Sequence, residues 1–194
     1  MPRPVALPLT ADQARALQVG DEVLVSGRIV TGRAAALRWL AEGDRPALRE
    51  ALAGGLLYHC APVVELAGAG AWRVVATAPV RSEQAEPWQA EVIARYGLRG
   101  VMGRGGMGPA TLAGLQEHGA VYLHATGGLA VVLARCVVRV LGVHELEALG
   151  PADALWELLV GDFPAVVTMD AQGKSLHALR ADEPATLAQQ LMER

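Results

Sequence analysis

Short apolar runs that end in glycine-rich turns and lead into helix-like segments recur along this chain, and they restrict it to a mixed α and β fold. One such unit is the run 98–102, followed by Gly-Arg-Gly-Gly-Met-Gly at 103–108 and by Pro109, a residue favoured at the first position of a helix. Another is the run 121–124, followed by the turn Thr126-Gly127-Gly128. Units that pass from a strand through a tight turn into a helix are typical of α/β domains. The sequence therefore predicts an α/β fold.

The remaining elements agree with this fold class. Periodicity, capping residues and turn residues predict helices at 10–17, 33–40, 46–53, 88–96, 109–118, 129–140 and 184–192, and strands at 22–30, 56–60, 63–66, 72–77, 98–102 and 121–124. Residues 155–173 hold two runs rich in β-branched residues on either side of Gly-Asp-Phe-Pro at 161–164, so we expect two strands joined at a corner. Ser26-Gly27 is expected to form a bulge or a corner in the strand 22–30.

Residues 129–143 are the most apolar stretch, and we expect a buried helix there rather than a membrane span. The stretch is about 15 residues long, whereas a span needs about 20 apolar residues. It also contains Arg135 and Arg139, which would share one helix face at their spacing of four and reach a polar rim or a partner. The proline-broken start of the chain lacks a targeting segment, so a cytoplasmic protein is expected.

The composition narrows the function class. With 194 residues, of which 52% are hydrophobic and 19% charged, the chain can bury the core of one ordinary domain. A net charge of −3 argues against nucleic-acid binding. Two cysteines, Cys60 and Cys136, are too few for a disulfide framework or a metal cage, and we expect both to be core residues, so no metal site is predicted in this chain.

Gly103, Gly105 and Gly108 match the spacing of a dinucleotide-binding turn. That motif also needs an acidic residue about 20 positions further on, and residues 121–126 contain no carboxylate. Two other interpretations stay open. The turn is either a structural one that needs positive φ, or an anion site built from backbone N–H groups and reinforced by Arg104.

Arg33 is a second candidate for anion binding. It lies at the start of the predicted helix 33–40, where a positive charge is unfavourable with the helix dipole, so a ligand-binding role would explain its position. A solvated arginine is the alternative. His59 and His124 lie in or beside apolar strands, and we expect both to be structural.

Five segments, in chain order, resemble the β subunit, or C-terminal half, of the iron–sulfur hydro-lyases, the family of class I fumarase and L-tartrate dehydratase. They are Ser-Gly-Arg-Ile-Val-Thr-Gly-Arg at 26–33, Leu-Tyr-His-Cys-Ala-Pro at 57–62, Val-Met-Gly-Arg-Gly-Gly-Met at 101–107, Tyr-Leu-His-Ala-Thr-Gly-Gly at 122–128 and Asp-Phe-Pro-Ala at 162–165. Each motif is modest alone, but five in the family's order are specific.

The resemblance implies a swivelling β/β/α domain, one domain over residues 1–194 with a core at about 19–173 and a tail at 176–194. It implies reversible dehydration of a 2-hydroxy dicarboxylate such as tartrate or malate, with a [4Fe-4S] cluster held by a separate α subunit and no metal held by this chain. The partners would be that subunit and the small dicarboxylate, with a homo-oligomer left open. The implied substrate-binding residues are Arg33, Thr31, Arg104, Gly103, Gly105, Gly106, Thr126, Gly127 and Gly128, and Ser82 is the candidate for a catalytic proton-transfer role.

The sequence departs from the family pattern where the chemistry is expected. The Asp and His that follow the family's arginine are Ala34 and Leu37 here, and the lysine of the glycine turn is Arg104. The family's Gly-Pro-Thr-Thr-Ser-x-Arg-Met loop is Ala-Pro-Val-Arg-Ser-Glu-Gln-Ala at 78–85, in which Arg81 would partly stand in for the lost groups. A second hypothesis follows: a catalytically degenerate homologue that binds a small anion or a protein.

Overall fold

The computed structural model describes residues 1–68 and 70–178, and its main feature there is a seven-stranded sheet with the order β1-β2-β3-β6-β7-β9-β8. The strands are β1 Arg3–Ala6, β2 Glu22–Thr31, β3 Leu56–Tyr58, β6 Gly100–Gly103, β7 Val121–His124, β8 Val137–His144 and β9 Leu155–Met169. The first five are parallel in their pairings, and β9 runs antiparallel to β7, β8 and β2. Because β9 pairs with both β7 and β2, it closes the sheet between them.

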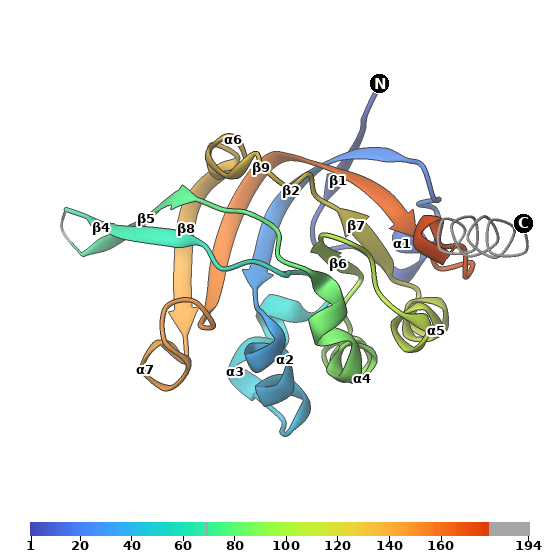
Figure 1. Cartoon of the computed structure of the whole chain (residues 1–194), viewed down its shortest axis with the longest axis horizontal. Coiled ribbons are helices and arrows are strands. Elements are labelled where there is room, and N and C mark those ends of the chain that lie inside the picture. Colours follow the sequence, from blue (N-terminus) through green and yellow to red (C-terminus); the bar gives the residue numbers. More distant parts are fainter. Residues whose placement is uncertain (69, 179–194) are drawn as a thin grey trace, which may run out of the picture.

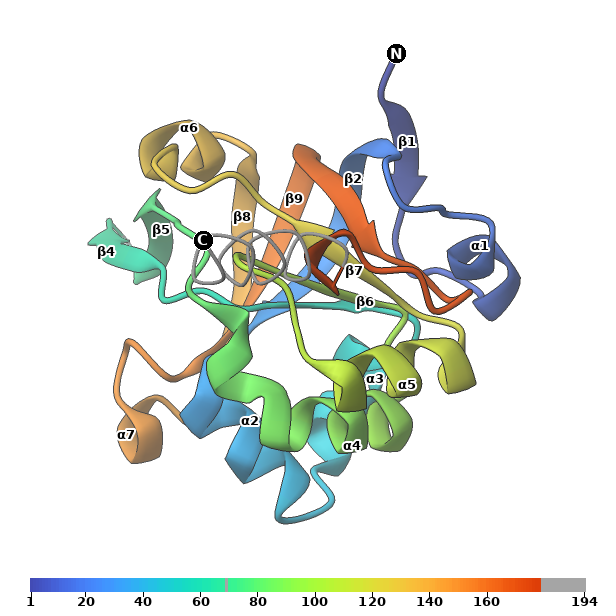
Figure 2. The same cartoon turned by 45° about the vertical axis from the view of Figure 1, so that its right-hand side comes forward.

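Helices cover one side of the parallel strands. The helical segments are α1 Ala11–Arg15, α2 Ala34–Ala41, α3 Pro46–Leu52, the 3₁₀ turn η1 Ser82–Ala85, α4 Glu86–Tyr96, α5 Pro109–His118, α6 Ala130–Ala134 and α7 Leu146–Leu149. Figures 1 and 2 show α2, α3, α4 and α5 along the lower side, beneath β6 and β7. A hairpin of β4 Val63–Ala67 and β5 Ala71–Ala76 projects at the left of Figure 1.

Two apolar cores fill the space between these layers. One lies between the parallel strands and the antiparallel strands, where Tyr58 packs edge-to-face on Phe163 with ring centroids 5.5 Å apart. The other lies between the parallel strands and the helices, with Leu37 and Ile93 fully buried. The central parallel strands β3, β6 and β7 are therefore buried on both faces, which matches the apolar runs in the sequence.

The mixed α and β class is confirmed, and several predicted signals act as expected. Thr10 caps α1 in a capping box, since its hydroxyl accepts the Gln13 N–H and the Gln13 side chain accepts the Thr10 N–H. Pro109 begins α5, and Gly119 ends it with φ 63°. The predicted helix at 184–192 lies outside the described residues.

The prediction of one helix over 129–140 is wrong. Helix α6 ends at Ala134, and residues from Val137 onward form strand β8, which pairs with β9 through contacts such as Val140 with Leu158. β-Branched residues favour extended backbone, and an available partner strand outweighs the helix-like spacing of the two arginines. Arg135 and Arg139 therefore do not share a helix face.

The prediction of two strands with a corner at 161–164 is also wrong, because β9 runs continuously through this segment. Its pairing with β2 continues on both sides, with Val25 opposite Phe163 and Gly27 opposite Val160. The extra residue is absorbed by a bulge in which Asp162 has φ 49° and its N–H donates to Ser26 Oγ at 2.9 Å. The turn residues thus bend one long strand instead of ending it.

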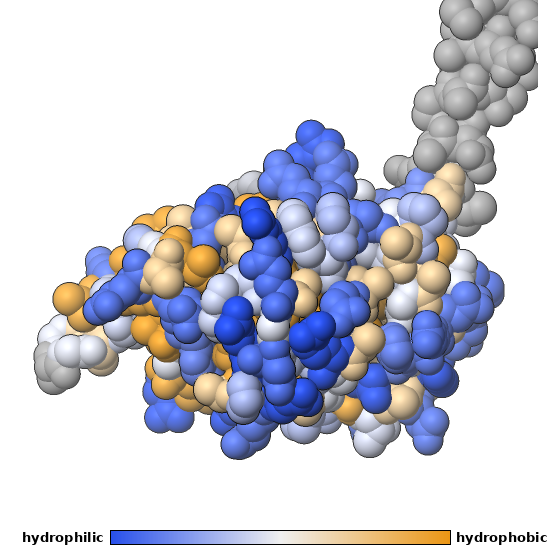
Figure 3. All heavy atoms as spheres, turned by 90° about the horizontal axis from the view of Figure 1, so that it is seen from below, coloured by the Kyte–Doolittle hydropathy of each residue, from blue (hydrophilic) through white to orange (hydrophobic). Residues whose placement is uncertain are grey.

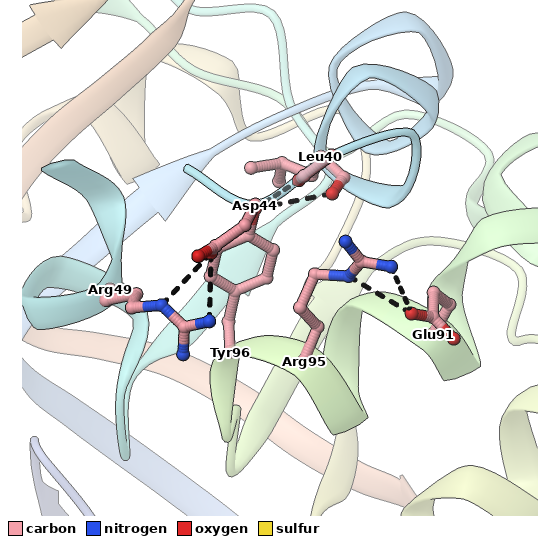
Figure 4. A network of polar contacts seen from close by, with 7 residues as sticks. Leu40, Asp44, Arg49, Glu91, Arg95 and Tyr96 are labelled. Carbon is pink, nitrogen blue, oxygen red and sulfur yellow. Dashed lines mark hydrogen bonds and ion pairs between the residues drawn. The ribbon is translucent and has the colours of Figure 1, made fainter. Parts of the chain in front are cut away.

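Two local ion pairs and one hydrogen bond between helices lie on the outer side (Figure 4). Asp44 accepts from Arg49 and Glu91 accepts from Arg95, while the Tyr96 hydroxyl donates to backbone carbonyls at the end of α2. Exposed pairs of this kind contribute little to stability, about 0–1 kcal/mol each. None of the described helices is long and apolar enough to cross a membrane.

Phe163→Ala should lower the free energy of unfolding by about 3–5 kcal/mol, because a fully buried ring is removed from the core between the strand layers. The neighbouring Pro164 is exposed on the other face of β9, so Pro164→Ala should change it by about 0.5 kcal/mol or less. Urea unfolding followed by circular dichroism measures both. Equal losses would contradict the placement of this strand.

Candidate functional site

An open pocket of about 580 Å³ lies beside the carboxyl ends of three adjacent parallel strands, β2, β3 and β6. It is lined by Arg33, Ala34, Ala35, Ala61, Ala78, Pro79, Val80, Arg81, Gln84, Arg104 and Asp153. Three guanidinium groups thus face one carboxylate among the lining residues. The carboxyl edge of parallel strands is the usual place for ligands in α/β proteins, and the charge balance favours an anion.

Arg33 reaches the pocket from the N-cap position of α2, directly after β2. Its guanidinium donates two hydrogen bonds to Asp153, from Nε to Oδ1 at 2.8 Å and from Nη2 to Oδ2 at 2.6 Å. These bonds raise the pKa of Arg33 above its ordinary value, so the group stays charged. The bidentate contact holds the side chain in one orientation and leaves Nη1 free of hydrogen bonds to the described residues.

Arg104 enters from the turn after β6, and its backbone is tied to the loop 78–85. The Arg104 N–H donates to the Val80 carbonyl at 3.2 Å, and the Ser82 N–H donates to the Arg104 carbonyl at 2.9 Å. Arg81 lies on the same loop and pairs with Glu83 at 2.6 Å. Arg104 has no ion pair among the described residues, so it is the cation there with the least internal competition for a ligand.

The amino end of α5 is already occupied by a carboxylate of the protein. Glu86 accepts from the Gly108 N–H at 2.8 Å and from the Thr111 N–H at 3.0 Å, and Thr111 also donates its hydroxyl. This is the place where a dinucleotide phosphate would bind in the fingerprint motif. The structure therefore gives a physical reason against the dinucleotide interpretation. Because Glu86 occupies the amino end of α5, an anion at this turn could bind only to Arg104 and to the backbone around Gly105.

A layer of buried polar side chains lies behind the pocket. The Ser82 hydroxyl is fully buried and lies 2.8 Å from the Tyr122 hydroxyl. A Cβ on Gly103 would overlap Ser82 Oγ, so this glycine permits a close approach of β6 to the loop. His59, beside them, pairs through Nε2 with Gln89 Oε1 at 2.8 Å.

The predicted site residues divide between the pocket and its surroundings. Arg33 and Arg104 both line the pocket, whereas Ser82 and Gly103 lie in the buried layer. Thr31 is fully buried and its hydroxyl accepts the Trp156 N–H at 3.1 Å, which holds β2 to β9. These contacts occupy the Thr31 and Ser82 hydroxyls with structural partners.

The glycines of the two turns also differ in exposure. Gly105 has φ 89° and is exposed, whereas Gly106 has φ 80° and is covered by the ring of His177. The exposed turn formed by Thr126, Gly127 and Gly128 lies beside Arg104, because a Cβ on Gly127 would come within 3.2 Å of the Arg104 Cδ. The second turn thus borders the pocket through Arg104 without lining it.

Neither cysteine is placed to hold a metal cluster. Cys60 is buried, its Sγ lies 2.9 Å from Thr77 Oγ1, and burial raises the pKa of its thiol to about 11. Cys136 lies just before β8, in the other strand layer. Residues 1–68 and 70–178 contain no group of three or more His, Cys, Asp or Glu side chains that could hold a metal ion. An iron–sulfur cluster does not fit these donors.

Comparison with known proteins adds a second line of evidence. A family model described as Fumarase C-terminus matches residues 3–180, almost the whole chain. The chain belongs to the fumarase C-terminus family. Its site can therefore be compared with the family pattern position by position.

Two relatives of this fumarase C-terminus domain show different chain organisations. The present chain is 47% identical over 170 residues to a Geobacillus stearothermophilus protein named "Putative fumarate hydratase class I". The match covers 88% of this chain and 32% of that protein. The chain is 34% identical over 179 residues to the L(+)-tartrate dehydratase subunit beta of Escherichia coli K12, covering 92% of this chain and 88% of that subunit. The chain thus spans about a third of the first relative and most of the second.

Three residues in or beside the candidate site of this fumarase C-terminus domain were missed in the sequence. Asp153 stands 120 residues after Arg33 in a Gly-Pro-Ala-Asp turn that has no motif of its own, so nothing linked the two. Gln84 lay within the altered loop but carried no charge. Glu86 could have been found, because an acidic residue beside Pro87 at a helix start is a capping signal, although its partner α5 could not.

His59 should make stability depend on pH. Burial lowers the pKa of His59 from 6.5 to about 4, an effect partly offset by its contact with Gln89. The unfolded chain binds this proton at higher pH, so stability is complete above about pH 6.5 and is lost as pH falls towards 4, by up to about 3 kcal/mol. His59→Gln should flatten the curve of unfolding free energy against pH in this window. His118→Gln, at the end of α5, is the control, and an equal effect of both variants would contradict the assignment.

Arg104→Ala should weaken binding of succinate, a simple dicarboxylate, at least about tenfold, because a charge-assisted contact contributes about 1.5–3 kcal/mol. Asp153→Asn should strengthen it several-fold, since it removes the one carboxylate that lines the pocket. Isothermal titration calorimetry at low ionic strength measures both constants. Arg38→Ala, on the exposed face of α2, is the matched control, and equal effects of Arg38→Ala and Arg104→Ala would refute the pocket as the binding site.

Proposed function

We propose that the chain is the β subunit, or β-like domain, of an iron–sulfur hydro-lyase that reversibly dehydrates a 2-hydroxy dicarboxylate of the tartrate or malate/fumarate type. The observation that carries this proposal is the convergence of Arg33, Arg81 and Arg104 on one pocket. The names of the relatives, a fumarate hydratase and a tartrate dehydratase subunit, support the reaction class.

Arg33 and Arg104 would each bind one carboxylate of the substrate. Asp153 already holds the Arg33 side chain in one orientation, with its Nη1 donor unused. Binding of a substrate carboxylate to Nη1 would therefore cost little further side-chain entropy. Arg104, on a turn whose backbone is bonded to the loop 78–85, would bind the second carboxylate. Backbone N–H groups of Gly105 and of the turn Thr126-Gly127-Gly128 would complete the contacts to that end of the substrate.

The cluster belongs, in this proposal, to a separate α subunit, because the two cysteines of this chain do not fit one. That cluster would supply a Lewis acid for the departing hydroxyl group. The present chain would bind and orient the carboxylates and close the site against water. The layers of strands and helices in residues 1–68 and 70–178 support the swivelling β/β/α domain that the resemblance implies. In this proposal one domain over residues 1–194 would move against the partner.

Ser82 remains the candidate for proton transfer, and its hydrogen bond with Tyr122 defines how it could act. The Ser82 hydroxyl is buried, so a proton would pass through the pair of hydroxyl groups. Burial raises the pKa of Tyr122 to about 12, so this pair holds its protons at neutral pH. Ser82→Ala should lower kcat more than it lowers substrate affinity if this role is correct.

A specific observation supports a second candidate, a degenerate homologue that binds a small anion or a protein without catalysis. Val80 and Gln84 line the pocket where the family pattern has a threonine and an arginine. The lining residues therefore offer one proton acceptor, Asp153, which is already bonded to Arg33. This candidate predicts dicarboxylate binding without turnover.

Co-expression with a cluster-bearing α subunit, followed by anaerobic dehydration assays on tartrate and malate, tests the proposal. Arg33→Ala should reduce kcat/KM at least about 100-fold, since it removes the charged Nη1 donor that would bind a substrate carboxylate. Arg38→Ala on the outer face of α2 should leave it unchanged. Unchanged activity of Arg33→Ala would show that Arg33 does not bind the substrate. Binding without turnover by the wild-type complex would favour the degenerate homologue.

A further inference from the structure

The exposed large hydrophobic side chains gather at one end of the molecule. Among the described residues, apart from Met1, they are Val63, Leu66, Leu129, Val131, Val132 and Val138. They lie on β4, on or just before α6, and on β8. Figure 3, seen from below, shows apolar atoms among charged ones at the left, towards the hairpin end, while α6, at the top of Figure 1, lies on the far side of that view. We call this surface the hairpin-end patch. Contiguous exposed apolar surface on a folded domain marks a place of interaction.

The hairpin-end patch has a well-anchored base. Trp72 of β5 packs edge-to-face on the buried Trp156 of β9, with ring centroids 5.3 Å apart. The Thr77 N–H donates to the Ala130 carbonyl at 3.0 Å, which ties the hairpin to α6. Between β5, α6 and β8 lies a groove of about 410 Å³ whose lining includes Val131 and Val138. A preformed groove on tied elements costs little ordering on binding.

The same elements form the rim of the anion pocket. Ala61 and Ala78, which flank the hairpin on its two sides, both line the pocket. The turn before α6 lies against Arg104 through Gly127. A partner seated on the hairpin-end patch therefore lies next to the pocket and can cover its open side.

The charges around the groove define the chemistry of the occupant. Arg73 is paired with Glu65 within the hairpin, whereas Arg135 and Arg139 are exposed and have no ion pair among the described residues. The nearby carboxylate of Asp162 is bonded to Ser26. A second copy of this chain would add its own two arginines to the interface, where like charges are unfavourable, so the fitting surface is apolar with carboxylates at its edge.

We infer that the hairpin-end patch docks the cluster-bearing partner of this chain, through an apolar partner surface edged by carboxylates that meet Arg135 and Arg139. This inference rests on the proposed function, because the partner is the subunit that completes the pocket. The Geobacillus relative supports a partner of this kind, since two-thirds of its chain lie outside the match.

The test measures association rather than activity. The full chain is titrated with the cluster-bearing subunit of the same genome, recognised by its match to the part of the Geobacillus protein outside the present chain. Val131→Asp with Val138→Asp should raise the Kd at least about tenfold, because charges are buried against an apolar surface. Arg135→Glu with Arg139→Glu should raise it too and weaken its salt dependence. Ala113→Asp, on the exposed side of α5, is the control.

The outcomes separate the inference from the proposed function. Retention of wild-type Kd by both double variants, in a complex that dehydrates substrate, would overturn the inference and leave the function standing. The inference would also be overturned if this chain forms a homodimer and the double variant Val131→Asp with Val138→Asp dissociates that homodimer. Patch-dependent assembly without dehydration would support the inference and count against the function. Arg33→Ala should abolish dehydration while the Kd stays unchanged.

Discussion

The antiparallel pairing of β2 with β9 is the constraint on which the site depends. The register that sets Val30 opposite Glu157 brings the end of β2 to the start of β9. The Trp156 N–H to Thr31 hydroxyl bond holds this junction, and the residues just beyond it on the two strands are Arg33 and Asp153. A slip of one residue would turn every side chain of β9 to the opposite face and separate the ion pair. The strand pairing therefore fixes the core and the position of the first cation together.

The sequence could predict those residues of the candidate site whose position follows from the nearby strand and turn. Arg33 and Arg104 each follow a parallel strand, and parallel strands in one sheet share a carboxyl edge, so two glycine-marked strand ends were enough to expect them together. Asp153 could not be predicted in this way, because its place depends on the long-range register of β9. Ser82 was chosen from a motif, yet its hydroxyl faces the buried layer, since η1 turns that side chain towards Tyr122.

The fold was predictable in class, and the errors share one physical cause. Residues 137–144 and 161–164 were judged from local signals, an i,i+4 arginine spacing and a Gly-Asp-Phe-Pro turn. In both places pairing with a neighbouring strand overrides the local signal. β8 forms because β9 offers an open edge, and β9 continues because its extra residue at Gly161 and Asp162 forms a bulge opposite Ser26 of β2. Helices with caps, such as α1 and α5, depend on nearby residues and were placed well.

Arginine takes over from several residue types of the family pattern in this chain, and that changes what the pocket can hold. Arg104 stands for a lysine and Arg81 for a threonine, so planar donors replace a point charge and a hydroxyl. The internal carboxylates Asp153 and Glu83 balance two of the three cations. The pocket thus keeps Arg33 and Arg81 paired within the protein, while Arg104 and the Nη1 donor of Arg33 remain for an anion.

The most direct test of this pocket is nuclear magnetic resonance of the arginine Nε–H groups during a titration with L-malate. The account predicts that Arg33, Arg81 and Arg104 shift together with one dissociation constant, while Arg49 and Arg73, paired on other surfaces, stay in place. Separate constants for the three, or shifts spread equally over all surface arginines without saturation, would contradict a single anion site.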